Sequence, residues 1–120
     1  GILPPKLELA KFSKKDQLLL DKLTAYIQAN LTKNNQLEVS HLQRVVKMSR
    51  PNLHKKLKEL TGLNTSQFRK NVRLNVAKKI LLNNPSLNIS EVAHQVGYKQ
   101  VNHFSRDFKE VFGISPKNIS

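Results

Sequence analysis

The chain has 120 residues, about the length of one small domain. It carries 21 Lys and Arg against 8 Asp and Glu, and this net charge of +13 predicts a polyanionic partner. Cysteine is absent, which excludes disulfides, cysteine-based zinc sites and a thiol nucleophile. No apolar run is long enough for a bilayer span or a secretory signal, so we expect a soluble cytoplasmic domain without membrane contact. In a membrane-anchored full-length protein it would lie on the cytoplasmic side.

The chain begins with an expected linker and a first helix. Residues 1–12 contain two prolines and no helical period, which is typical of a linker from an upstream domain. Ser13 and Asp16 have the spacing of a capping box, and apolar residues follow at helical spacing. These apolar residues are Leu20, Leu23, Ile27 and Leu31. The polar residues 32–36 end the helix.

Two shorter helices are predicted next, over 39–46 and 50–61. Ser49 has the position of an N-cap, and Pro51 fits the first turn, where its missing N–H is not needed. Gly62 then ends the second of these helices.

The remainder of the chain is also helical in pattern. Asn64 begins a long helix over about 65–83, and Asn88 caps a further short helix. The last helix covers about 100–111 and ends at Gly113. No alternating strand pattern of useful length occurs, so the predicted fold is all-α.

Two segments of the chain repeat each other. At an offset of 50, the residues Val39, Leu42, Val46 and Met48 correspond to Ile89, Val92, Val96 and Tyr98. At an offset of 51, the residues Leu53, Leu57, Leu60, Gly62 and Leu63 correspond to Phe104, Phe108, Val111, Gly113 and Ile114. Each copy is a short helix, a tight turn and a longer helix, which is a helix-turn-helix. We therefore expect a leading helix and first helix-turn-helix over 13–63, a linker helix over 64–84, and a second helix-turn-helix over 85–120.

The longer helix of each copy has one apolar side and one polar side. The apolar sides carry Leu53, Leu57 and Leu60 in the first copy, and Phe104, Phe108 and Val111 in the second. The opposite sides carry Pro51, His54, Lys55 and Lys58, and Asn102, Ser105, Arg106 and Lys109. The acidic residues Glu59, Asp107 and Glu110 fall outside both polar arcs. These arcs offer only hydrogen-bonding and basic groups, so we predict that their eight residues contact DNA bases in the major groove.

The residue types suggest individual roles at such an interface. Arg106 suits guanine, Asn102 suits adenine, and His54 and Lys55 suit the acceptor atoms of base edges. A second group is expected to contact phosphates, which position a protein without specifying sequence. That group is Ser49, Thr65, Arg69, Lys70 and Arg73.

The basic residues are unevenly distributed. Residues 50–80 hold nine bases and one acid, whereas residues 81–120 hold four bases and three acids. Our hypothesis is that the first region supplies most of the electrostatic affinity and the second copy more of the base selection.

Two stretches carry a resemblance to a known family: 90–116, SEVAHQVGYKQVNHFSRDFKEVFGISP, and 48–74. The first is similar to the second helix-turn-helix, and the second to the end of the first motif and the linker helix, of the DNA-binding domain of the AraC/XylS family of transcription regulators. The resemblance implies about seven helices, recognition helices in successive major grooves of promoter DNA, transcription activation, and contact with RNA polymerase. The stretch MSRPNLHKKLKELTG with its leading helix resembles the output domain of hybrid two-component regulators, which implies an upstream receiver or sensor domain.

The first copy departs from the family pattern in three places. Gln43 stands where Ala is common, Lys47 where Gly is common, and Glu38 where the N-cap is usually Ser or Thr. If the turn is left-handed at Lys47, a residue other than glycine there costs roughly 1–2 kcal/mol.

Two other classes of function fit the sequence less well. The four histidines lack the spacing of a metal or acid–base pair, and no nucleophile or phosphate-loop motif occurs, so we expect no enzyme, metal or cofactor. A non-specific or structural RNA-binding protein is the alternative function. RNA recognition stacks bases on exposed aromatic rings, but here only Phe12 and Tyr26 fall outside the predicted core.

Overall fold

A computed structural model describes residues 13–119, which form six α-helices, two short 3-10 helices and no strand. The helices are α2 (Lys14–Ala29), η1 (Asn34–Leu37), α3 (Val39–Val46), α4 (Arg50–Thr61), α5 (Thr65–Asn83), α6 (Ile89–Gln95), α7 (Val101–Phe112) and η2 (Pro116–Asn118). The all-α fold with two helix-turn-helix units is confirmed, and its helix count is close to the seven implied by the resemblance. The linker expected over 1–12 lies outside the described residues.

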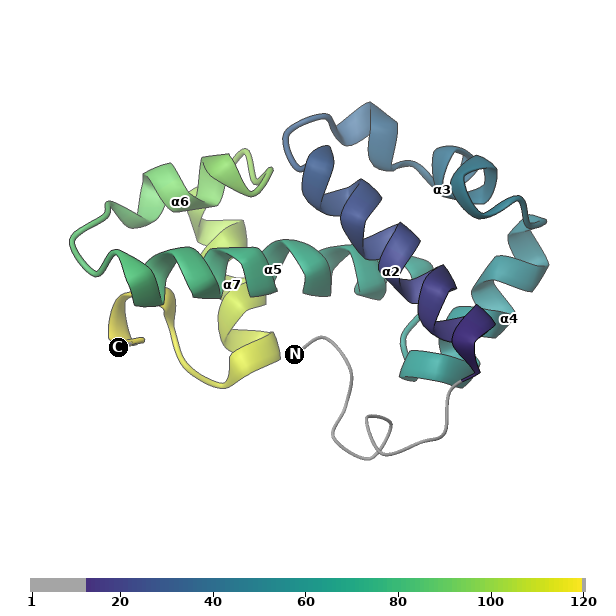
Figure 1. The fold of residues 1–120 in the computed structure, drawn as a ribbon. Helices are drawn as coiled ribbons and strands as arrows, with labels where there is room; N and C mark the ends of the chain where they lie inside the picture. Colours follow the sequence, from purple (N-terminus) through teal and green to yellow (C-terminus); the bar gives the residue numbers. More distant parts are fainter. Residues whose placement is uncertain (1–12, 120) are drawn as a thin grey trace.

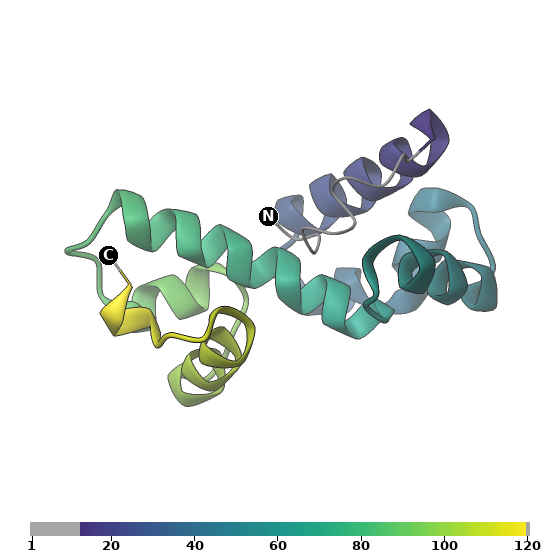
Figure 2. The same cartoon turned by 90° about the horizontal axis from the view of Figure 1, so that it is seen from below.

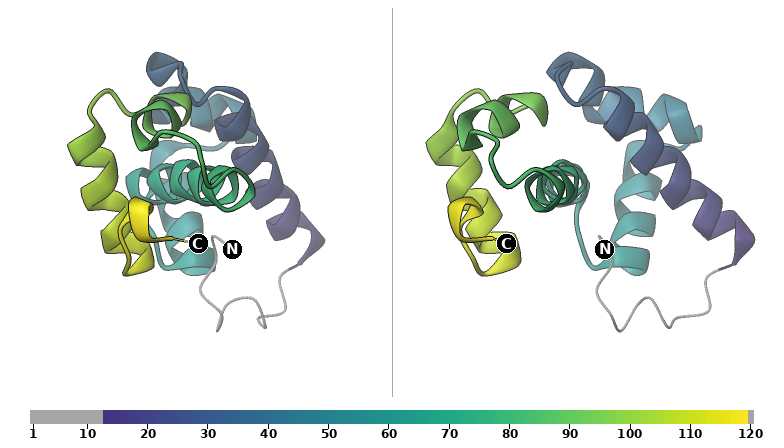
Figure 3. Two further views of the ribbon diagram at one scale, coloured as in Figure 1. Left: turned by 90° about the vertical axis from the view of Figure 1, so that its left-hand side faces the viewer. Right: turned by 60° about the vertical axis from the view of Figure 1, so that its left-hand side comes forward.

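Helix α5 is the central element of the molecule. It runs between a group formed by α2, α3 and α4 and a second group formed by α6 and α7 (Figure 1). The view from below shows the two groups toward opposite ends of α5 (Figure 2), and a further view shows α5 nearly end-on between them (Figure 3, right). Both groups pack on α5, so this helix joins the two helix-turn-helix units.

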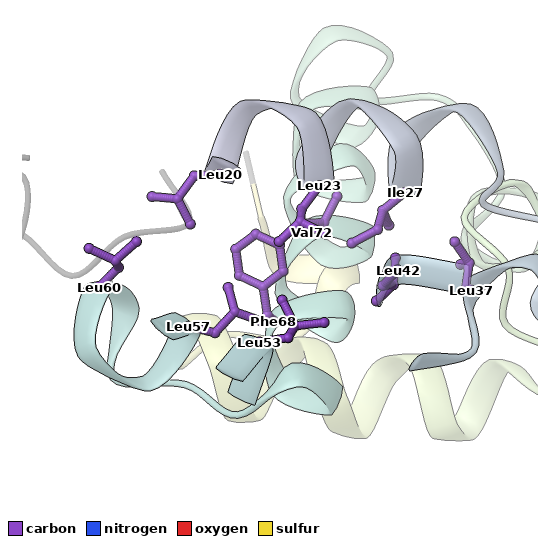
Figure 4. Packing of buried hydrophobic residues seen from close by; sticks show 10 residues of the cluster. All are labelled: Leu20, Leu23, Ile27, Leu37, Leu42, Leu53, Leu57, Leu60, Phe68 and Val72. Carbon is purple, nitrogen blue, oxygen red and sulfur yellow. The ribbon is translucent and has the colours of Figure 1, made fainter. Parts of the chain in front are cut away.

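The first hydrophobic core consists mainly of leucines. Figure 4 shows Phe68 of α5 surrounded by side chains from α2 and α4. The core residues are Leu20, Leu23, Ile27, Leu37, Leu42, Leu53, Leu57, Leu60, Phe68 and Val72. This core fixes α4 against α2 and α5 and thereby leaves the opposite side of α4 free.

The second hydrophobic core uses the other half of α5 and is richer in aromatic rings. Its buried residues are Leu74, Ala77, Leu81, Val92, Ala93, Val96, Phe104 and Phe108. The ring of Phe108 lies 5.7 Å from that of Phe104 and 4.7 Å from that of Phe112, in tilted and edge-on arrangements that aromatic pairs prefer. The boundary between the two cores therefore falls within α5, between Val72 and Leu74.

Local capping explains most of the helix boundaries. The hydroxyl of Ser13 accepts a hydrogen bond from the backbone N–H of Asp16 at 3.1 Å, and Asn64 forms a full capping box with Gln67. Gly62 and Gly113 end α4 and α7 with φ of 75° each. The left-handed conformation is one that glycine adopts without strain, and its recurrence at both sites confirms the repeat.

Three local features differ from the sequence expectations. Helix α2 ends at Ala29, so Leu31 packs from the loop that follows. The polar segment 32–36 ends the first helix as expected, but its last three residues also begin η1, which ends at the buried Leu37. Tyr26 is not free, because its hydroxyl donates to the backbone oxygen of Gln36 at 2.9 Å.

Candidate nucleic-acid interface

The two helix-turn-helix units have matching turns. The backbone N–H of Met48 donates to the oxygen of Gln43 at 3.1 Å, and that of Tyr98 donates to Ala93 at 2.9 Å. Lys47 has φ of 56° and ψ of 47°, and the equivalent Gly97 has φ of 98°. The turn of the first unit is thus left-handed at a lysine, and Lys47 is the only residue other than glycine with positive φ within 13–119.

The face of α4 opposite its leucines is open to solvent. Pro51, Lys55 and Lys58 are exposed, whereas His54 is half-buried. The Nδ1 atom of His54 lies 2.5 Å from the hydroxyl oxygen of Thr65, the first residue of α5. This hydrogen bond fixes the imidazole and presents it at the edge of the exposed face.

The face of α7 has the same organisation. Asn102, Arg106 and Lys109 are exposed, and Ser105 is half-buried beside them. The side chain of Arg106 is 67% exposed, and its Nε lies 3.3 Å from Oδ1 of Asp107. The structure thus brings together four of the predicted base-contact residues on α4 and four on α7.

Apart from the contact of Asp107 with Arg106, the carboxylates of α7 bind groups outside the polar face of α7. Asp107 accepts a hydrogen bond from the hydroxyl of Tyr98 at 2.9 Å, and Glu110 lies 3.7 Å from the ammonium of Lys70 on α5. Burial and the hydrogen bond to Asp107 raise the pKa of Tyr98, which keeps this phenol neutral.

The five predicted phosphate contacts have more diverse environments. Ser49 is exposed, and its hydroxyl caps α4 by accepting from the N–H of Asn52 at 3.3 Å. Thr65 has no exposed surface, so a phosphate cannot reach its hydroxyl in this conformation. The other three, Arg69, Lys70 and Arg73, are half-buried on α5.

The two arginines of this group already bind parts of the protein. Arg69 donates from Nη1 to the backbone oxygen of Leu37, and Arg73 donates from Nη2 to Oδ1 of Asn34, both at 2.5 Å. Burial lowers the pKa of both guanidinium groups, although they remain charged at neutral pH.

Two basic residues were missing from the predicted interface. Arg50 begins α4, and Lys99 lies in the turn before α7, where backbone N–H groups also point outward. Both side chains are exposed and form no ion pair within the described part of the chain. Their position at the helix starts was the available signal, but the charge density of α5 suggested other residues.

Across residues 13–119, no cluster of three or more histidine, aspartate and glutamate side chains is arranged to hold a metal ion. None of the helices in that range combines the length and apolar character needed to cross a membrane.

Comparison with known proteins identifies relatives of the whole fold. A family model described as "Helix-turn-helix domain" matches residues 42–120. The chain is 32% identical over 101 residues to "Histidine kinase P4" of Formosa agariphila, covering 84% of this chain and 7% of that protein. Among the first curated relatives, the chain spans only 7% to 30% of their length.

Solved structures show the same architecture. A transcriptional regulator from Chromobacterium violaceum, described as containing an AraC-type DNA-binding domain, superposes with a TM-score of 0.75 at 26% identity, covering 88% of this chain and 91% of that one. The C-terminal domain of the two-component response regulator yesN from Fusobacterium nucleatum gives 0.68 at 28% identity, with 89% and 98% coverage. Two matching turns, two recognition-type helices and the family match agree, and the chain belongs to the helix-turn-helix domain family, in its AraC type.

Proposed function

We propose that this domain binds double-stranded promoter DNA in a sequence-specific manner, with α4 and α7 in successive major grooves. DNA binding as such follows from its family. The observation that carries the finer proposal is that α4 and α7 occupy equivalent positions in the two units and that both expose a polar, basic face.

The base contacts would come from the exposed faces of the two helices. Arg106 can donate two hydrogen bonds to guanine, and Asn102 can pair with adenine. Both side chains are exposed near the first half of α7, the part of a recognition helix that reaches base edges. The other proposed base contacts are Pro51, His54, Lys55, Lys58, Ser105 and Lys109.

Phosphate contacts would come chiefly from the starts of the two helices. Ser49, Arg50 and Lys99 are exposed there, next to helix N-termini that attract anions. Arg69, Lys70 and Arg73 would contribute positive potential along α5 rather than leave their partners within the protein. Thr65 would act indirectly, by holding the ring of His54.

We further propose that the domain is the output module of a longer regulator that activates transcription. One relative is named a histidine kinase, and one structural neighbour is the C-terminal domain of a two-component response regulator. An upstream receiver or sensor domain and contact with RNA polymerase fit this arrangement. We expect such a regulator to work in the cytoplasm, without catalytic activity in this domain.

Selection of bound duplexes from a random DNA pool tests the proposal. We expect enrichment of a site with two conserved segments about one helical turn apart, one for each recognition helix. The double variant Asn102→Ala and Arg106→Ala should lose conservation in one segment only. An unenriched pool with steep salt dependence, or equal competition by structured RNA at the same salt, would contradict sequence-specific DNA binding.

A further inference from the structure

Two recognition helices select one half-site spacing most sharply when their relative placement is fixed. Besides the packing of both units on α5, a direct contact between the units would hold that placement. Leu31 packs against both hydrophobic cores, so the loop after α2 reaches the second unit. We call the residues around this contact the junction: Leu31, Asn34, Arg73, Gly97 and Tyr98.

The backbones of the two units approach each other closely at the junction. A Cβ atom placed on Gly97 would lie 2.1 Å from the backbone oxygen of Leu31, closer than real atoms can approach. The turn of the second helix-turn-helix is therefore in direct contact with the loop after α2 of the first. A glycine is required here by space as well as by its φ of 98°.

The side chain of Arg73, which belongs to α5, reaches the place where the two units meet. Its Nη2 donates to Oδ1 of Asn34 in the first unit at 2.5 Å. Its guanidinium carbon lies 3.3 Å from the position that a Cβ of Gly97 would occupy in the second unit. Its charge also acts on the neighbouring phenol of Tyr98 and lowers the pKa of that group, against the larger effect of burial. Arg73 thus interacts with both units at once.

The phenol of Tyr98 extends the connection to the recognition helix. Its hydroxyl donates to Asp107 of α7 at 2.9 Å, and its ring packs edge-on against Phe104 with centroids 5.5 Å apart. Arg73, Tyr98 and Asp107 line one hollow, so a shift of Arg73 would change the surroundings of Tyr98 and Asp107 beside α7. This connection distinguishes Arg73 from Lys79, which is exposed on the same helix.

We propose that Arg73 is a positioning residue that holds the two helix-turn-helix units at one relative orientation and so sets the half-site spacing that the domain selects. This inference rests on the proposed function for its DNA consequence, but the orientation itself exists without DNA. The competing role is a direct phosphate contact, which predicts a loss of charge-dependent affinity and no change in orientation.

The orientation can be measured in the free domain. The chain has no cysteine, so Lys22→Cys on α2 and Glu91→Cys on α6, both exposed, allow two spin labels at chosen sites. Double electron–electron resonance should give a narrow distance distribution that broadens in Arg73→Met and stays narrow in the control Lys79→Met. Asn34→Ala removes the exposed acceptor without disturbing either core, and it should also broaden the distribution.

Binding to DNA supplies the second measurement. On selected sites with one base pair inserted or removed between the half-sites, the spacing preference of Arg73→Met should fall roughly tenfold, while its slope of affinity against salt stays near that of Lys79→Met. An unchanged distance distribution overturns the proposal, as does a spacing preference that is retained. If the unsubstituted domain selects no DNA sequence, the proposed function fails, and the distance distribution alone decides whether Arg73 fixes the orientation.

Discussion

The two helix-turn-helix units share a backbone plan but differ in how it is stabilised. The first has a leucine-rich core and a left-handed lysine in its turn, and it adjoins the most basic part of the chain. The second has an aromatic core and a glycine in its turn, and its region is almost neutral. One geometry can therefore be reached with different local energetics.

The difference also leads us to expect two separate contributions to DNA binding. A dense positive region gives affinity for any duplex, whereas an ordered face with few charges depends on matching hydrogen bonds. Phe104 and Phe108 hold α7 in place as fully as Leu53 and Leu57 hold α4, so the expected difference arises from charge rather than from packing. We therefore expect substitutions in the two units to have different consequences.

The largest effect is expected at the turn of the second unit. Gly97→Ala adds a Cβ that would lie 2.1 Å from the oxygen of Leu31, in a backbone conformation that disfavours side chains. We expect a loss of unfolding free energy on the order of 3 kcal/mol, from strain and the forced shift of packed backbone. Urea denaturation, monitored by circular dichroism, measures this unfolding free energy.

Gly62→Ala is the matched control for this variant. Gly62 has φ of 75°, but a Cβ there meets no atom within 4 Å. Only the cost of a left-handed backbone for a residue with a Cβ applies, so we expect the unfolding free energy to fall by about 1 kcal/mol. Equal losses in the two variants would contradict a close approach of the two units at Gly97.

The next effect concerns the division between affinity and base selection. Arg106→Ala should weaken binding to the selected site by about 1–3 kcal/mol and leave binding to random duplex nearly unchanged. Arg50→Ala, at a proposed phosphate contact of the first unit, should weaken binding to both and reduce the slope of log affinity against log salt by about one. Fluorescence anisotropy across a salt series measures both quantities.

Lys22→Ala, exposed on α2 outside the proposed interface, is the control for nonspecific charge loss. If Arg50→Ala abolished discrimination and Arg106→Ala changed only the salt slope, the assignment of roles to the two units would be reversed.

The sequence predicted those features of the fold that depend on neighbouring residues. Caps at Ser13, Ser49 and Asn64 predicted where helices begin. In each case the side chain of the cap accepts a hydrogen bond from the backbone N–H three residues further along the chain. The apolar spacing on α4 and α7 predicted their buried sides, and Leu53 and Phe104 are fully buried as expected.

Contacts between distant segments could not be predicted in this way. The partner of Arg69 is 32 residues away and that of Arg73 is 39 residues away. The positive charges of Arg69 and Arg73 on α5 were consistent with a DNA-facing surface. In the structure, however, η1 and the loop that precedes it pack against that side of the helix. Which face of α5 remains free depends on how the two units pack, and no local pattern encodes it.

A smaller effect is expected at the turn of the first unit. Lys47→Gly places glycine in a left-handed conformation that the lysine holds at a cost. We expect a gain in unfolding free energy of about 1 kcal/mol, reduced somewhat by the greater freedom of glycine in the unfolded chain. Lys47→Ala keeps the Cβ and removes the charge, so it should give no comparable gain in thermal denaturation. A gain of equal size in both variants would show that charge repulsion, not backbone strain, destabilises this turn.

The smallest expected effect lies at the starts of the recognition helices. Ser49 caps α4 with its hydroxyl, whereas Gln100 at the equivalent position of α7 makes no side-chain cap, although its backbone is extended as an N-cap requires. Gln100→Ser should therefore supply the missing acceptor and raise the unfolding free energy by about 0.5 kcal/mol. Ser49→Ala, the reciprocal change, should lower it by about 1 kcal/mol. If Gln100→Ser instead destabilised the domain, the glutamine would be making a contribution to the turn that its hydrogen bonds do not reveal, and capping would not explain the difference between the two units.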